Sequence, residues 1–310
     1  MSERLYPATA VERAPSAPLS RSSAEVAGGR RPKPRQFDQP RFLKYFTALV
    51  FVYLFAPIVV VFLFSFNSKR STQIFGTFSM RWYDVLIHDS SMLTSLQASI
   101  EVAFVTMIVG TAIGTVLAFG LVRSRSRINR PTDVVMLLNL VSPEIVTAIA
   151  LLLVWSEVGS YLGTLGIRFG LSLTTVALGH ITWSIPYVTI IVRGRLASLN
   201  QEVEEAAQDL GATSLQAVRL ATLPLLWPAI IASALLVFVM SFDDFVTSYF
   251  LSGVDLVPLP IRIYSMIHFG VTPEINAIGT VMMLVTISIV LVALLVYSRQ
   301  QQARLQFLAE

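Results

Sequence analysis

The stretch that decides the fold is residues 194–226, GRLASLNQEVEEAAQDLGATSLQAVRLATLPLL. A simple connector would be shorter and less patterned, and this one predicts two short helices. Gly211 suits the left-handed backbone position that ends a helix. Thr213 can cap a second helix, and Gln216 three residues later completes a capping box. The stretch therefore predicts a helical hairpin, either a docking surface for a soluble partner or an amphipathic connector lying on lipid headgroups.

Long apolar segments lie on both sides of this hairpin. The chain is 54% hydrophobic and only 14% charged, against about 25% charged residues in ordinary soluble domains. Each apolar segment has roughly the 20 residues that a helix needs to cross about 30 Å of hydrocarbon. The segments are residues 46–66, 102–122, 134–155, 171–192, 227–250 and 277–298. The sequence therefore predicts an all-α, polytopic membrane helix bundle with six transmembrane helices.

The chain divides into three regions by composition. Residues 1–44 are rich in Ser, Pro, Ala and Arg, and they bury too little apolar surface to offset chain entropy, so we expect a disordered basic tail. Residues 45–298 form the transmembrane domain, with the hairpin at about 194–226, and residues 299–310 form a C-terminal tail. Pro224 is expected to break the helical pattern before the fifth span.

The Lys and Arg residues are distributed unevenly between the two sides of a six-span chain. The side of the termini carries 18 of the 23, and the opposite side carries five. The positive-inside rule therefore places both termini and the hairpin in the cytoplasm. The high isoelectric point reflects the basic tail, so we expect no nucleic-acid partner.

Several kinds of chemistry are disfavoured by the residue content. The chain has no cysteine, and its three histidines lie far apart without metal-ligand spacing. It contains neither the G-x-x-x-x-G-K-[ST] phosphate loop nor a G-x-S-x-G nucleophile motif. We therefore expect no enzyme activity, catalytic residue, metal or cofactor in this chain. An ATP-driven process would need a separate ATP-binding subunit.

Three acidic residues fall within predicted spans: Glu144 in the third, and Asp243 and Asp244 in the fifth. A charged side chain at mid-bilayer costs at least about 2.5–3.5 kcal/mol, and no intramembrane Lys or Arg pairs with these acids. They are expected to line a water-accessible cavity that attracts cations. Neighbouring helical residues point about 100° apart, so both aspartates should not face one pathway. The acids could instead lie near span ends, be protonated, or pair with a partner subunit.

Other residues in the spans have structural interpretations. Gly110 and Gly114 form G-x-x-x-G, which predicts close helix packing. His180 is interpreted mainly as a packed, hydrogen-bonded residue, with a pathway role as the alternative. Pro143 and Pro186 are expected to kink spans three and four, or to unwind them locally.

The hairpin resembles the EAA loop of ABC-importer permeases, whose pattern is E-A-A, three residues, Gly, nine residues, then I-x-L-P. The present chain departs from it only at Ala221, where the pattern prefers Ile. In that family the loop is a coupling helix that docks in a cleft of the ATP-binding subunit. The resemblance implies that the matching residues contact or position this subunit; they are Glu205, Ala206, Ala207, Gly211, Leu223 and Pro224.

Further segments resemble the second permease of spermidine/putrescine ABC importers: SPEIV, SFDDFV, SYFLSG and IRIYSMIHFGVTPEINAIGT. The similarity runs from about residue 45 to residue 298. It implies a type I ABC importer permease (MetI-like) fold in a bacterial inner membrane, working by alternating access. It also implies four partners: an ATP-binding subunit dimer, a paralogous second permease, an extracytoplasmic substrate-binding protein and a cationic polyamine.

Two alternatives stay open at this point. Related permeases carry opines, phosphonates, thiamine or iron, so a different solute is the first. The second is an ion-coupled secondary transporter that uses Glu144 or the aspartates as proton carriers. The EAA-like loop argues against the second alternative, because such a transporter needs no ATPase docking surface.

Overall fold

The computed structural model describes residues 41–307 except positions 72, 125, 255 and 271. The described residues are helical apart from loops and one isolated β-bridge between Asn67 and Phe78. The chain divides into two units, Met1–Tyr53 and Leu54–Glu310, and every site discussed below lies in the second. Most of the predicted disordered tail lies outside the described residues, but positions 41–44 already belong to a helix.

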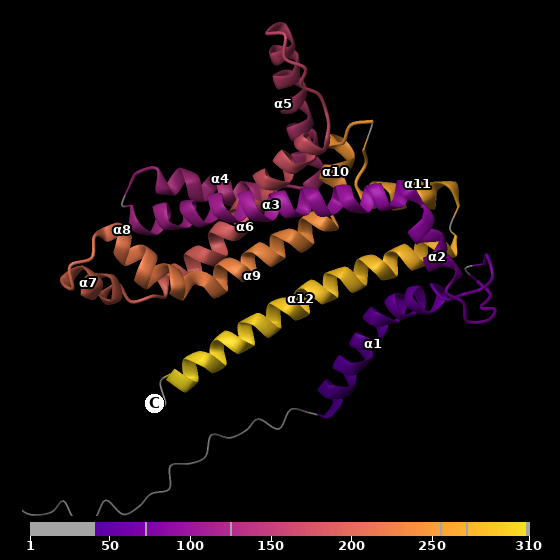
Figure 1. Ribbon diagram of the computed structural model, residues 1–310, viewed down its shortest axis with the longest axis horizontal. Coiled ribbons are helices and arrows are strands. Elements are labelled where there is room, and N and C mark those ends of the chain that lie inside the picture. Colours follow the sequence, from indigo (N-terminus) through magenta and orange to yellow (C-terminus); the bar gives the residue numbers. More distant parts are fainter. Residues whose placement is uncertain (1–40, 72, 125, 255, 271, 308–310) are drawn as a thin grey trace, which may run out of the picture. The chain divides into compact units, whose positions relative to one another are not determined.

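Six helical segments are long and apolar enough to cross a membrane, which confirms the predicted all-α membrane fold. Their helices are α1 (Arg41–Phe64), α3 (Ser90–Arg123), α5 (Glu144–Thr164), α6 (Leu173–Ala197), α9 (Leu223–Phe242) and α12 (Pro273–Phe307) (Figure 1). Shorter helices connect them: α2 (Arg81–His88), α4 (Asn129–Val141), α7 (Glu202–Asp209), α8 (Ser214–Ala217), the π-helix η1 (Val218–Thr222), α10 (Val246–Leu251) and α11 (Leu259–Phe269).

Two predicted spans are wrong in their boundaries because the helix breaks inside them. The third predicted span, 134–155, is divided between α4 and α5 at Ser142 and Pro143. Ser142 is extended, with ψ 136°, because a residue that precedes proline is sterically excluded from the helical region. The fifth, 227–250, ends as a helix at Phe242. Glu144 and the two aspartates therefore lie beside helix ends, not in helix interiors.

The expected break at Pro224 does not occur. Helix α8, η1 and α9 follow one another directly, so that residues 214–242 form one membrane-span candidate. The Leu223 N–H bonds to the Val218 carbonyl in the wider π pattern. Pro224 then stands in the first turn of the α-helical segment α9, where the missing N–H of proline costs little.

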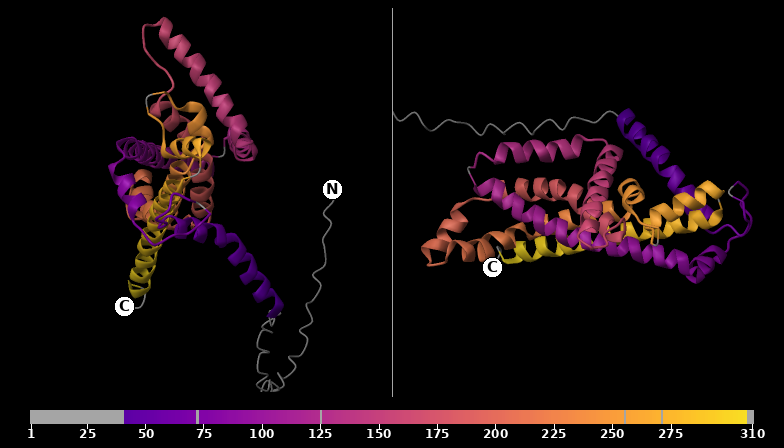
Figure 2. Two further views of the ribbon diagram at one scale, coloured as in Figure 1. Left: turned by 90° about the vertical axis from the view of Figure 1, so that its right-hand side faces the viewer. Right: turned by 90° about the horizontal axis from the view of Figure 1, so that it is seen from above.

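Helices α3, α6 and α9 pack together and form the centre of the second unit (Figures 1 and 2). The predicted small-residue contact is confirmed: a Cβ added at Gly114 would lie 2.6 Å from the Val188 Cβ. The Thr189 hydroxyl on α6 also donates a hydrogen bond of 3.2 Å to the Gly114 carbonyl. Glycine is required here because the two helix backbones approach too closely for a side chain. This packing holds α6 and α9 in place around the site.

Candidate functional site

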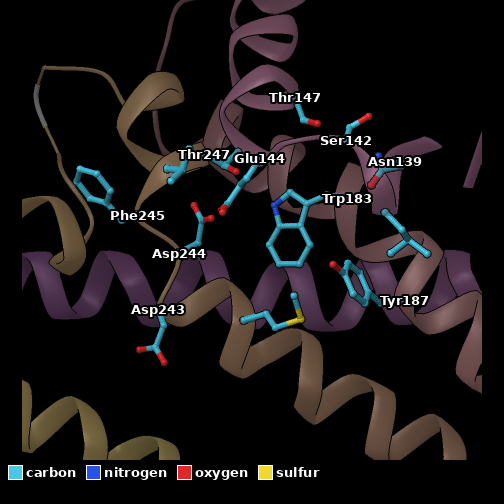
Figure 3. A pocket seen from close by; sticks show the side chains of 13 residues that line it. Asn139, Ser142, Glu144, Thr147, Trp183, Tyr187, Asp243, Asp244, Phe245 and Thr247 are labelled. Atoms are coloured by element: carbon cyan, nitrogen blue, oxygen red, sulfur yellow. The ribbon is translucent and has the colours of Figure 1, made fainter. Parts of the chain in front are cut away.

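A cavity of about 450 Å³ lies where the two helix breaks face α6 (Figure 3). Its walls come from the end of α4, the start of α5, one face of α6 and the segment between α9 and α10. At each break one helix ends and another begins. Helix ends leave backbone polar groups without intrahelical partners, so polar side chains and backbone groups gather around the same space. The two helix breaks therefore create the cavity; the break at Pro143 is one of the two outcomes expected from the sequence, and the break at Asp243 is not expected from it.

The three predicted acids are brought together at this cavity. Glu144, Asp243 and Asp244 all contribute to its lining. The carboxyl groups of Glu144 and Asp244 interact and point toward each other, whereas Asp243 points away from both (Figure 3). The expectation that the aspartates diverge is met, but its premise of a continuous helix is wrong, since α9 ends at Phe242. Asp244 is buried, and the other two acids are exposed within this single chain.

Asp244 is held by a network that the sequence did not reveal. The fully buried imidazole of His180 bonds through Nε2 to the Asp244 Oδ2 at 3.0 Å and through Nδ1 to the Ser241 Oγ at 2.7 Å. The Ser248 N–H donates to the same Oδ2 at 2.8 Å. From the sequence, only Lys and Arg are considered as partners for these acids, and Asp244 pairs instead with a histidine of α6. The hydrogen-bonded interpretation of His180 is confirmed.

Two aromatic side chains of α6 complete the wall of the cavity. Trp183 and Tyr187 both line it, and their rings meet edge to face with centroids 6.2 Å apart. The Trp183 Nε1 is buried and has no hydrogen-bond partner among the described residues. Sequence reasoning did not select this pair, although the four-residue spacing that puts both rings on one helical face was visible. Aromatic faces beside carboxylates suit an organic cation, which the rings attract through their quadrupole.

The two predicted short helices of the hairpin at 194–226 correspond to α7 and α8, but α8 does not end as a separate helix and continues through η1 into α9. Glu205, Ala206 and Ala207 lie in α7. Gly211 follows at φ 91°, a left-handed conformation that favours glycine. The capping box is present, because the Gln216 N–H donates to the Thr213 Oγ1 at 3.3 Å and the Gln216 Oε1 accepts from the Thr213 N–H at 2.8 Å.

Three leucines of this hairpin are strongly exposed. Leu210, Leu215 and Leu220 expose 90%, 78% and 71% of their surface. Leu215 and Leu220 belong to the membrane-span candidate 214–242, so these leucines suit contact with lipid as well as with a protein partner. Leu223 and Pro224, the last residues of the EAA-like pattern, begin α9 directly behind it.

A polytopic helical chain with a polar cavity at helix breaks and a structured hairpin between two spans has the architecture of a transporter permease. Solved structures agree. A bacterial ABC transporter involved in the import of the acidic polysaccharide alginate aligns with TM-score 0.68 at 16% identity, over 83% of this chain and 96% of that one. A methionine ABC transporter aligns with TM-score 0.52 at 15% identity, over 73% of this chain and 98% of that one. At these identities the alignments establish the fold alone.

Sequence relatives are more specific. Residues 110–304 match the family described as binding-protein-dependent transport system inner membrane component. The chain is 34% identical to the spermidine/putrescine transport system permease protein PotC of Haemophilus influenzae, over 81% of this chain and 94% of that protein. It is 35% identical to the putrescine transport system permease protein PotI of Escherichia coli K12, over 76% and 83%. The chain belongs to the family of binding-protein-dependent transport system inner membrane components, and it is a multi-pass membrane permease of the ABC importer class.

Proposed function

We propose that this permease carries polyamines such as putrescine and spermidine through the cavity at the helix breaks. The observation that carries the proposal is the pairing of Glu144 and Asp244 with the aromatic rings of Trp183 and Tyr187 around one space. A polyamine presents protonated amines separated by short methylene chains. Carboxylates attract the amines, and the rings contact both the cations and the methylenes. The relatives named for spermidine and putrescine support the same substrate class.

The acids have different proposed parts in this pathway. Asp244 is fixed by His180 and Ser248, so we assign it the stationary end of the site. Glu144 is exposed in the isolated chain and faces Asp244, and we assign it contact with a passing cation; Asp243 is also exposed but points away (Figure 3), and we assign it a separate position along the pathway. We propose that a second permease, a paralogue of this chain, covers the side of the cavity that is exposed in the isolated chain.

The hairpin is the proposed contact with an ATP-binding subunit dimer. We propose that both termini and the hairpin are cytoplasmic, because 18 of the 23 Lys and Arg residues fall on that side of a six-span chain. The exposed leucines of the hairpin support a protein partner. The proposed contact residues are Glu205, Ala206, Ala207, Gly211, Leu223 and Pro224. ATP binds to the partner subunit. The conformational change of that subunit then displaces the hairpin surface of this chain.

An extracytoplasmic binding protein is the proposed source of substrate. The family description names binding-protein-dependent transport, and one alginate transporter with this fold is solved with a periplasmic protein bound to an alginate pentasaccharide. In alternating access, the binding protein releases substrate into a cavity open to the outside. ATP binding and hydrolysis by the partner then exchange the outer and inner gates.

Uptake into proteoliposomes tests this function. The complete complex, with its second permease, ATP-binding subunit and binding protein, should accumulate radiolabelled putrescine or spermidine only when ATP is present. Uptake that persists without ATP and collapses with an uncoupler would favour the secondary transporter. ATP-driven uptake of an opine, phosphonate, thiamine or iron that polyamines do not compete would contradict the substrate.

The acids are tested in the same assay. Replacing both Asp243 and Asp244 by Asn in one variant should lower polyamine uptake about tenfold or more. A tenfold change corresponds to about 1.4 kcal/mol. Asp84→Asn is the matched control, because the Asp84 side chain is 79% exposed on α2, away from the cavity. Unchanged uptake kinetics in a double variant that inserts normally would remove both aspartates from the pathway.

A further inference from the structure

Three glutamates lie in the first turn of α7, and their surroundings differ. Glu202 and Glu205 are exposed, whereas the Glu204 side chain retains only 12% of its exposure. Its Oε1 forms an ion pair with the Arg123 guanidinium and accepts a hydrogen bond from the Thr222 hydroxyl. Glu204 lies immediately before the E-A-A motif, so the sequence pattern did not select it.

The two partners of Glu204 lie where the hairpin adjoins two membrane helices. Arg123 is the last residue of α3, the 34-residue helix at the centre of the unit. Thr222 is buried and is the last residue of η1, immediately before α9 begins. One carboxylate oxygen therefore joins the hairpin to the end of α3 and to the start of α9.

This polar contact matters because α7 has little else to hold it. No residue of α7 is buried, so the helix has no apolar anchor in the core. Its close neighbours are α8 and η1, which belong to the same hairpin. The Glu204 side chain is largely shielded from solvent, so its two polar contacts hold together the segments that they join.

The far end of α9 leads into the cavity. Helix α9 begins next to the Glu204 contact at Leu223 and ends at Phe242, and Asp243 and Asp244 follow directly. Helix α9 is one helical segment with Pro228 inside it, and we infer that displacement of its first turn is passed along this segment to its last turn. Glu204 is thus placed between the surface that a motor would push and the helix that carries the cavity acids.

We propose that Glu204 is a positioning residue that transmits displacement of the hairpin to α3 and α9, and so couples ATP hydrolysis to movement of the cavity. The proposal rests on the proposed function, since it presumes an ATP-hydrolysing partner on α7. It assigns no contact between Glu204 and that partner. The coupling acts through Arg123 and Thr222 within this chain.

A charge exchange in the complete transport complex tests the proposal. Glu204→Arg should leave assembly and ATP hydrolysis in place and lower the amount of polyamine imported per ATP by about tenfold, which is the effect of a coupling free energy of ordinary size. Adding Arg123→Glu restores an ion pair of opposite polarity and should recover most of the ratio. Glu202→Arg is the matched control, because it alters an exposed glutamate in the same turn whose carboxylate accepts a hydrogen bond from Asn200 instead.

Smaller substitutions test the same contact with less risk to folding. Glu204→Gln and Thr222→Val should each lower the ratio of import to hydrolysis in part, and their effects should not add, because both bonds share one oxygen atom. The ratio of import to hydrolysis is the readout that separates coupling from structure, because a variant that only misfolds or fails to assemble loses both activities together.

Three results would overturn the proposal while leaving the proposed function intact. One is a normal ratio of import to hydrolysis in Glu204→Arg. Another is failure of Arg123→Glu to restore that ratio in a complex that is folded and assembled. The third is loss of the ATP-binding subunit from Glu204→Arg, which would place Glu204 in the docking surface itself. If the wild-type complex shows no ATP-driven uptake, the proposed function fails, and the coupling role fails with it.

Discussion

His180 stabilises the buried acid of the cavity, Asp244. This histidine is fully buried and is one of the two hydrogen-bond donors described for the Asp244 Oδ2; the other is the backbone N–H of Ser248. A buried carboxylate that loses a partner bears a desolvation penalty of about 1–3 kcal/mol, or more for a charged group. The imidazole therefore stabilises the one acid of the cavity that is not exposed.

We expect His180→Leu to lower the thermal unfolding temperature of the purified protein and to raise the KM for polyamine uptake, because Asp244 loses its fixed position. Thr189→Val is the matched control, since Thr189 is a buried hydroxyl on the same helix that bonds to Gly114 and does not line the cavity. It should lower the unfolding temperature without raising the KM. Equal KM values for both variants would show that His180 is structural only.

The residues of the cavity are predictable from the sequence to different degrees. Acids within apolar runs stand out, so Glu144, Asp243 and Asp244 can be selected from their hydrophobic surroundings alone. The histidine that holds Asp244 lies 64 residues earlier in the chain, and no local spacing connects them. Only the packing of α6 against the end of α9 brings that pair together.

At the scale of elements, α3 has a cap that responds to pH. The Asp89 carboxylate accepts hydrogen bonds from the Ser91 hydroxyl at 2.7 Å and from the Ser91 and Met92 N–H groups at 2.9 and 3.2 Å. The Ser91 hydroxyl and these N–H groups lower the pKa of Asp89 below its ordinary value. The stabilisation is therefore present above the unfolded-state pKa and is lost as the pH falls through the lower folded-state value.

Asp89→Ala should reduce the free energy of unfolding by about 1 kcal/mol at neutral pH, the usual contribution of an N-cap. The difference from wild type should shrink below the folded-state pKa, where the wild-type carboxyl is protonated. Asp89→Asn keeps a capping oxygen without a charge, so its stability should vary less with pH. Unfolding measured in detergent at several pH values checks this, and a pH-independent difference for Asp89→Ala would contradict it.

The contact between α3 and α6 depends on a missing side chain. Gly114→Leu should destabilise the protein by about 1–3 kcal/mol, the usual penalty for overpacking, because its Cβ would meet Val188 at 2.6 Å. Gly120→Ala is the control on the same helix, since no atom lies within 4 Å of a Cβ added there. Thermal unfolding of both variants measures the difference, and equal stability would contradict the close approach of the two helices.

The helix break at Asp243 is missed from the sequence, and the break at Pro143 is predicted only as an alternative to a kink. Hydropathy averages over a span, so the apolar runs around Pro143 and around Asp243 appeared continuous. The same proline was recognised as a possible kink, but the extended Ser142 and the separate helix α4 depend on local backbone sterics. At Pro224 the error is the reverse: a break was predicted, but a π turn precedes the proline and the helix continues. The hairpin was predicted well because its caps are local signals.

At the scale of the whole molecule, the chain has two features, and neither of them alone accounts for the proposed transport function. One is a cavity of acids and aromatic rings at helix breaks. The other is a hairpin with exposed leucines at the opposite end of α9. Helix α9 connects them physically, and this connection is why we assign one function to both.

The central claim is that the hairpin meets an ATP-binding subunit in the cytoplasm, and a single introduced cysteine tests it most directly. The natural chain has no cysteine, so Glu205→Cys provides a unique thiol for a photoactivated cross-linker in the intact membrane complex. We predict a covalent adduct with the ATP-binding subunit and no labelling by a membrane-impermeant thiol reagent added outside the cell. Labelling from outside, or no adduct in a complex that still hydrolyses ATP, would contradict the account.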